Sequence, residues 1–210
     1  DEARDLVYLQ YHATFRGGVV DSIKVSLSYQ SMSDDMNRVT ANTGAAQTKR
    51  EVRTASVNTP GAWVQAGKQT GLGFVTAGVD WYRDVVNSGG HDWLVNGTLR
   101  SFDRGNVADD TVYQMFGVFL QDEVVVGDLE ITPGVRYSRV SVRTDEIDPD
   151  PLDAVPFENL DETYQAVTGS LRLLYHLDAH WNLLAGWGMG FRAPSLEDTT
   201  AVRLIFSGAT

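Results

Sequence analysis

Alternation with a period of two constrains this chain more than any other feature. Residues 164–177 and 181–191 each place apolar side chains at every second position, with polar residues or glycine between most of them. A period of two puts successive side chains on opposite faces of a β-strand. Only Asp178, Ala179 and His180 separate the two runs, which is typical of a three-residue hairpin loop. We therefore predict a β-hairpin with one apolar face and one polar face.

The register of this hairpin follows from the same pattern. A shared register requires apolar residues to pair with one another. Closing the loop meets this requirement by pairing Leu177 with Trp181, Tyr175 with Leu183, Leu173 with Ala185 and Leu171 with Trp187. On the other face, Arg172 falls opposite Gly186. Ser170 falls opposite Gly188, so we expect glycine to leave room there for a long polar side chain.

The same alternation recurs along the rest of the chain. It covers residues 3–15, 23–29 and 74–82, and continues on both sides of the two-residue turn Gly127-Asp128. That turn pairs Val126 with Leu129, Val124 with Ile131, Leu120 with Val135 and Val118 with Tyr137, and leaves Asp122 opposite Pro133 as a misfit. Residues 49–66 are expected to form an interrupted strand, because Pro60-Gly61 lies within them. We count about eight strands and no amphipathic helix.

Short and long connections alternate along the chain. Short turns follow the predicted strands that end near 15, 66, 126 and 177, whereas long polar segments cover about 34–48, 84–111 and 145–162. Tight turns on one side and long loops on the other are typical of an outer-membrane β-barrel. Several runs also exceed the ~10 residues that a tilted strand needs to cross a bilayer. A soluble β-sandwich also alternates, and it remains the alternative.

Composition excludes several classes of protein. No run of the 210 residues approaches the ~18 apolar residues of a transmembrane helix. No signal peptide is identified. The absence of cysteine rules out a disulfide framework and a thiolate metal site. The net charge of −11 argues against a nucleic-acid partner, which would favour a basic surface.

Three stretches resemble a known family. The stretch "GWGMGFRAPSLED" resembles the "GRGFRAPSL" motif of TonB-dependent outer-membrane receptors. The stretch "FLQDEVVVGDLEITPGVRYSRV" resembles that family's "FxQDxxxxxxLxLTPGLRYD" segment, and Val75–Asp84 is similar to its "YGxDYYRD". The matches lie in order over most of residues 74–198.

This resemblance implies a ~22-stranded antiparallel transmembrane β-barrel in the bacterial outer membrane, with a plug domain inside it. Such receptors capture a ligand at their external loops and plug, and release it inward with energy from the TonB complex. About eight strands cannot close such a barrel, and no plug, energy-coupling box or closing strand is identified. We therefore expect residues 1–210 to be part of the barrel domain, with the plug domain not present in this chain. The polar face, with Asp80, Arg136 and Arg172, would line the lumen.

The candidate ligand-binding residues are His91, Trp93 and Arg192. His91 and Trp93 fall in a predicted external loop, where they would contact a ferric chelate or a porphyrin; the alternative is a solvated loop. Arg192 belongs to a motif that is emphasised in haem receptors, although the alternative is that Pro194 only ends strand pairing. His12, His176 and His180 have no metal-ligand spacing, so no metal site is predicted.

The segment 145–162 holds eight acidic residues and no basic one. Oxygen ligands of this kind bind calcium, but a flexible acidic loop is the alternative. Ser195 is the candidate for a catalytic nucleophile, but it follows a proline, lies outside a Gly-x-Ser-x-Gly motif and has no accompanying His/Asp arrangement. No catalytic residue, enzyme activity or cofactor is therefore predicted.

The expected function is active uptake of a chelated nutrient, such as an iron-siderophore or haem, in the bacterial outer membrane. The expected partners are outer-membrane lipid, the ligand, and the TonB complex through the missing N-terminal part. A passive porin or structural barrel is the first alternative, and an outer-membrane enzyme is the second.

Overall fold

The computed structural model describes residues 2–41, 48–94, 96–102, 107–144, 160–195 and 198. These residues form one antiparallel sheet of nine strands. The strands are β1 (Glu2–Thr14), β2 (Ser22–Ala41), β3 (Thr48–Gln69), β4 (Gly73–Trp93), β5 (Leu99–Phe102), β6 (Thr111–Val126), β7 (Leu129–Thr144), β8 (Asp161–His176) and β9 (Asn182–Gly188). Within this part of the chain, no helix is long and apolar enough to cross a membrane.

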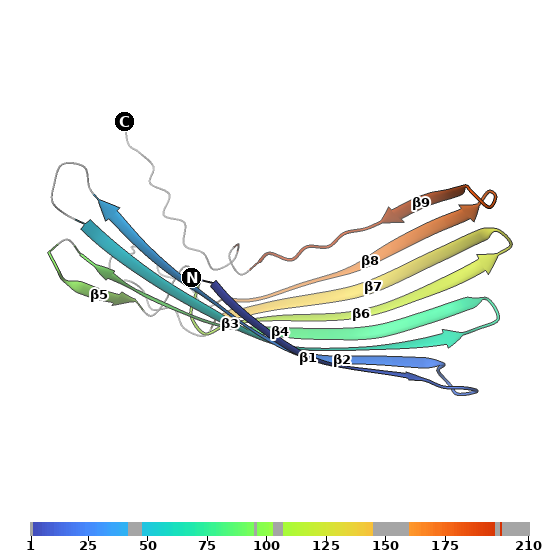
Figure 1. Ribbon diagram of the computed structural model, residues 1–210, viewed down its shortest axis with the longest axis horizontal. Helices are drawn as coiled ribbons and strands as arrows, with labels where there is room; N and C mark the ends of the chain where they lie inside the picture. The colour runs from blue at the N-terminus through green and yellow to red at the C-terminus, as the bar shows by residue number, and fades with distance from the viewer. Residues whose placement is uncertain are drawn as a thin grey trace.

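The strands follow one another across the sheet almost in chain order. The order is β1-β2-β3-β4-β6-β7-β8-β9, and the short β5 pairs with the end of β4. Figure 1 shows a curved sheet whose tight connections gather at one end, which we call the turn end. These connections are residues 15–21, 70–72, 127–128 and 177–181. We call the opposite end the loop end. In the described residues β1 and β9 are free edges, so the sheet does not close on itself.

The predicted registers are confirmed. The pairs of β8 with β9 include Leu171 with Trp187 and Arg172 with Gly186, as predicted. The pairs across Gly127-Asp128 likewise include Leu120 with Val135. The predicted misfit between Asp122 and Pro133 is also present, because the β6–β7 pairing skips both residues together with their neighbours Glu123 and Thr132. Within the described residues, the Asp122 Oδ1 atom is buried without a hydrogen-bond partner.

Two predicted loops are largely strand, so these predictions were wrong. β2 and β3 extend through most of residues 34–48, and β4 extends to Trp93. The hydropathy pattern fades there because a strand beyond the bilayer meets water on both faces, while its backbone hydrogen bonds persist regardless of side-chain polarity. The predicted strand 181–191 is shorter than expected and ends at Gly188. The acidic segment 145–162 lies outside the described residues up to 159, and its last two residues begin β8.

The predicted interruption of β3 at Pro60 was also wrong for the strand as a whole. β3 runs continuously from Thr48 to Gln69, and Pro60 pairs with Tyr29 of β2. Only the ladder to β4 skips Thr59 and Pro60, without a change of register. Proline lacks an N–H group, so the loss is local to one ladder.

The sheet has two chemically different faces. One row of paired residues crosses seven strands and is apolar throughout: Tyr11, Val25, Val64, Val79, Val118, Tyr137 and Val167. We call this the outer face, and we call the other the inner face. Leu9, Leu120 and Trp187 have the outer register and expose 68%, 48% and 62% of their surface. An apolar surface of this extent needs an apolar surrounding, which fits the lipid-facing side of a transmembrane barrel.

The inner face carries the buried residues. Val86, Val140 and Val142 have this register, as do the buried polar residues Thr76 and Ser88. Few apolar side chains are buried among the described residues, so this part of the fold is held by hydrogen-bonded strand pairing rather than by a closed apolar core. Arg172 and His176 lie on this face, and Leu171 and Tyr175 lie on the outer face, as predicted.

Candidate functional site: the inner face

The centre of the inner face carries a two-point ion pair. Arg136 of β7 donates from Nη1 to Asp80 Oδ1 at 2.7 Å and from Nη2 to Asp80 Oδ2 at 2.8 Å. Its Nε donates to Ser138 Oγ at 3.0 Å. Asp80 lies on β4, so the guanidinium spans β6 at Gly117, where an added Cβ would collide with Arg136. Glycine here lets two distant strands exchange a charge-assisted pair, which fixes the arginine in one orientation.

Aromatic side chains cover other glycines of this face. A Cβ added at Gly78 would meet the ring of Phe119 at 2.5 Å, and one added at Gly67 would meet the ring of Phe74 at 2.5 Å. Gly186 of β9, which lies opposite Arg172, is not covered by an aromatic side chain. The nearest heavy atom to a Cβ at Gly186 is Leu171 O, at 4.0 Å. The predicted room therefore exists there, but Arg172 does not fill it.

The end of the described chain reaches the loop end of the inner face. Tyr113 Oη of β6 donates to the carbonyl of Pro194 at 3.1 Å. Ser195 N–H donates to Asp198 Oδ2 at 2.9 Å, and Asp198 N–H donates to Ser195 Oγ at 3.2 Å. This reciprocal exchange is a capping-box arrangement. Arg192 forms a loose ion pair with Asp198 at 3.4 Å, and 83% of its side chain is exposed.

His91 and Trp93 lie in β4 and not in a loop, so that part of the prediction was wrong. Their rings meet edge to face with centroids 4.4 Å apart, and Arg50 Cζ lies 5.2 Å from the Trp93 centroid. Both residues have the outer register, because they pair with Val52 and Arg50. The structure therefore brings His91 and Trp93 together, but on the face opposite to the one that Arg192's segment contacts.

The remaining histidines show no metal-binding arrangement. His176 contacts Glu130 Oε1 at 3.0 Å and Asn182 Oδ1 at 2.6 Å. His180 lies in the β8–β9 turn, 3.9 Å from Asp178. No group of three potential metal ligands occurs among the residues that the structure describes.

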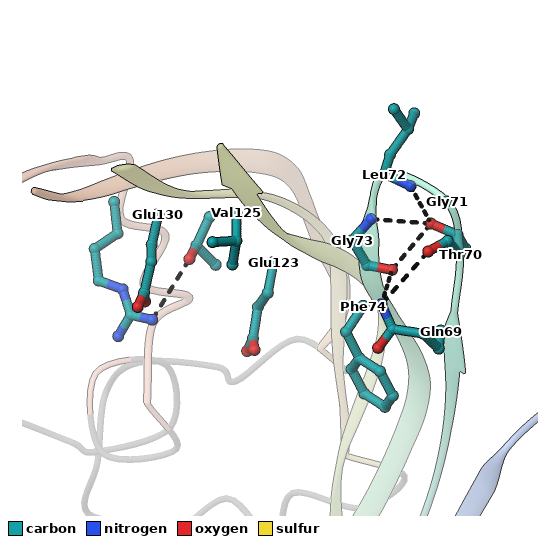
Figure 2. Close-up of a pocket in the computed structure, with 11 residues that line it drawn as sticks. Gln69, Thr70, Gly71, Leu72, Gly73, Phe74, Glu123, Val125 and Glu130 are labelled. Carbon is teal, nitrogen blue, oxygen red and sulfur yellow. Dashed lines mark hydrogen bonds between the residues drawn. The ribbon is translucent and has the colours of Figure 1, made fainter. Parts of the chain in front are cut away.

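Two adjoining concavities hollow the inner face near the turn end. One measures about 480 Å³ and the other about 560 Å³. Glu123, Thr132 and Arg172 line both of them. Figure 2 shows Glu123 and Glu130 pointing to the same side of the sheet, while Leu72 points away at the β3–β4 turn. The sequence pattern placed Arg172 on this face, but contained no sign of the concavities, because they depend on curvature.

Sequence reasoning missed the contacts at the loop end. Tyr113 and Pro194 are 81 residues apart, and no periodicity links them. Thr59 and Asp84 form a further unpredicted pair there, with the hydroxyl donating to Asp84 Oδ1 at 2.6 Å. The only feature that could have indicated these contacts is the register of β4 with β6, which places Asp84 opposite Tyr113.

Comparison with known proteins identifies one family model and two similar structures of interest. The model, described as "TonB dependent receptor-like, beta-barrel", matches residues 1–209. "Copper transporter OprC" is similar with a TM-score of 0.73 and 17% identity, covering 88% of this chain and 31% of that chain. "Crystal structure of ferric citrate transporter FecA in the unliganded form" has a TM-score of 0.59 and 18% identity, covering 88% and 27%. At these identities the likeness shows the fold alone. No curated protein sequence matches the chain.

Proposed function

This chain belongs to the TonB-dependent receptor family, and we propose that it forms one section of the barrel wall of an active transporter for a chelated nutrient. The family consists of transporters of the bacterial outer membrane and not of enzymes. The chain spans 31% and 27% of the two similar structures. We propose that the plug domain and the remaining strands belong to a longer polypeptide, and that its N-terminal part contacts the TonB complex.

One observation carries this proposal: the sheet separates an apolar outer face from a polar inner face along its whole width. The row from Tyr11 to Val167 suits lipid. The inner face at the same level holds the Arg136–Asp80 pair, whose arginine side chain stays 40% exposed. A polar lumen of this kind suits a barrel that is filled by water or by another protein segment.

The cargo that we propose is a metal chelate, most simply an iron complex. The two similar structures carry titles that name copper and ferric citrate. Ferric chelates with carboxylate groups are anionic, and Arg192 offers an exposed guanidinium at the loop end of the inner face. His91 and Trp93 remain candidate contacts for a ligand that approaches the loop end from outside.

Uptake measurements on the intact receptor test this proposal. In cells that express it, uptake of labelled ferric siderophore, haem and cobalamin is measured with and without a proton-motive force. Saturable uptake that stops when the proton-motive force collapses supports the receptor. Passive and unsaturable flux of unrelated small solutes would instead identify a porin and overturn the proposal. An Arg192→Gln variant, with Arg16→Gln at the turn end as control, would then test the site.

A further inference from the structure

Arg172 has no carboxylate partner in the described part of the chain. Its one hydrogen bond is a long contact from Nη2 to Thr132 Oγ1, at 3.4 Å. Two other inner-face arginines are paired at 2.7 Å: Arg136 with Asp80 and Arg53 with Asp92. A guanidinium carries five N–H donors in a planar fork that matches a carboxylate. Most of these donors remain available at Arg172.

The nearby acids are directed to other partners. Glu130 lines one of the two concavities with Arg172, but it contacts His176 at 3.0 Å. Glu123 lines both concavities, and it accepts a hydrogen bond from Gln121 Nε2 at 3.2 Å. Neither forms an ion pair with Arg172 within 4 Å. Arg172 therefore adds a cationic side chain without a carboxylate partner to the lining of both concavities.

The surroundings of Arg172 add neutral donors and open space. Ser170 and Thr132 supply hydroxyl groups, and Gln121 supplies an amide, along the wall of the 560 Å³ concavity. Opposite Arg172, the space at Gly186 contains no atom closer than 4.0 Å to an added Cβ. Arg172 and Gly186 therefore line the same concavity, and the glycine adds no side chain to it.

We propose that Arg172 is a carboxylate-binding site on the inner wall, near the turn end of the barrel. Its guanidinium donates two parallel hydrogen bonds to the carboxylate, and the hydroxyl groups beside it add further donors. The carboxylate comes either from a protein segment inside the lumen or from a solute that crosses it. The site rests on the proposed barrel wall, but not on the energy dependence of uptake.

The test uses the intact receptor, purified in detergent, with three variants. Arg172→Gln removes the charge, and Arg172→Lys keeps the charge but loses the fork. Lys24→Gln is the matched control, because Lys24 is an exposed inner-face cation that lines neither concavity. The first measurement labels carboxylates with a carbodiimide and glycine ethyl ester, and mass spectrometry locates the labels. The second measures how fast phenylglyoxal modifies Arg172, with and without citrate as probe.

Two results support the site and distinguish the sources of the carboxylate. If a protein segment supplies it, Arg172→Gln raises the labelling of one luminal carboxylate about tenfold, equivalent to ~1.4 kcal/mol, and Lys24→Gln does not. If a solute supplies it, labelling is unchanged, but citrate slows the modification of Arg172 several-fold. Arg172→Lys, which preserves the charge, gives a smaller effect in the first case. Fast modification of Arg172 that citrate does not affect, with no change in carboxylate labelling, would overturn the proposal. Loss of energy-dependent uptake alone would contradict only the proposed function.

Discussion

Replacing Leu120 by arginine tests whether the outer face meets lipid. Leu120 lies on β6, six residues from its end at Val126, and exposes 48% of its surface. At about 3.3 Å per residue and a tilt of about 45°, it lies roughly 14 Å from the turn end. The apolar band of such barrels is about 25 Å tall, so Leu120 lies near the midplane.

The depth of the substituted residue in the bilayer sets the size of the expected loss of stability. An arginine at the bilayer midplane destabilises a barrel by about 2–4 kcal/mol, and one near the interface by about 0–1 kcal/mol. Leu173 is only three residues from the end of β8, so Leu173→Arg is expected to cost less than Leu120→Arg. Ser170→Arg adds the same charge on the inner face, beside the concavity, and is expected to cost least.

The assay is urea unfolding of the intact receptor in phospholipid vesicles, followed by tryptophan fluorescence. The expected order of destabilisation is Leu120→Arg, then Leu173→Arg, then Ser170→Arg. Equal losses in Leu120→Arg and Ser170→Arg would refute the assignment of the two faces, because depth and face would then have no effect.

Three further predictions address local contacts. Gly117→Val forces the Arg136 guanidinium away from Asp80, because the added side chain occupies the space of the guanidinium. It is expected to destabilise the intact receptor by about 1–3 kcal/mol in the urea-unfolding assay, because overpacking displaces side chains. A loss below about 0.5 kcal/mol would contradict this prediction. Tyr113→Phe removes the hydrogen bond to Pro194, which is worth about 1 kcal/mol. Amide hydrogen exchange in residues 189–195 is therefore expected to become about fivefold faster, without unfolding of the barrel. Unchanged exchange would show that the contact does not hold the segment. The pKa of Asp21 lies below its usual 3.8, because Lys68 and then the backbone N–H of residue 69 donate hydrogen bonds to it. Its contribution to the stability of the β1–β2 turn is therefore present above pH 3.8 and is lost as the pH falls through the lower folded-state pKa. Asp21→Asn is expected to lose proteolytic protection of this turn at neutral pH, and its difference from the wild type is expected to shrink as the pH falls below 3.8. A difference that does not change with pH would contradict this assignment.

Strand register was predictable from the sequence where lipid meets one face. In the β8–β9 hairpin, Leu171 and Trp187 pair as the alternation requires, since a slip by one residue would turn the apolar residues inward. The polar parts of β2 to β4 were not predictable. Beyond the bilayer both faces are wet, so Asp35 or Asn87 can occupy a strand without any periodic pattern.

The site was predictable only in part. The pattern placed Asp80 and Arg136 on one face, but they are separated by a whole strand, and only the glycine between them explains how they meet. The loop assignment of His91 and Trp93 failed because strand β4 continues to Trp93. Contacts such as that of Tyr113 with Pro194 depend on the path of the chain after β9, which no local pattern encodes.

Lipid contact along β6 is the most direct test of the barrel wall. The chain contains no cysteine, so single cysteines at positions 118, 119, 120 and 121 of the intact receptor can be spin-labelled individually, once any cysteines elsewhere have been replaced. Collision with oxygen, which concentrates in lipid, is compared with collision with a water-soluble nickel chelate. The outer register of Val118 and Leu120 predicts oxygen maxima at these positions, with minima at Phe119 and Gln121. Maxima at 119 and 121, or a profile without alternation, would contradict the lipid-facing wall on which the function rests.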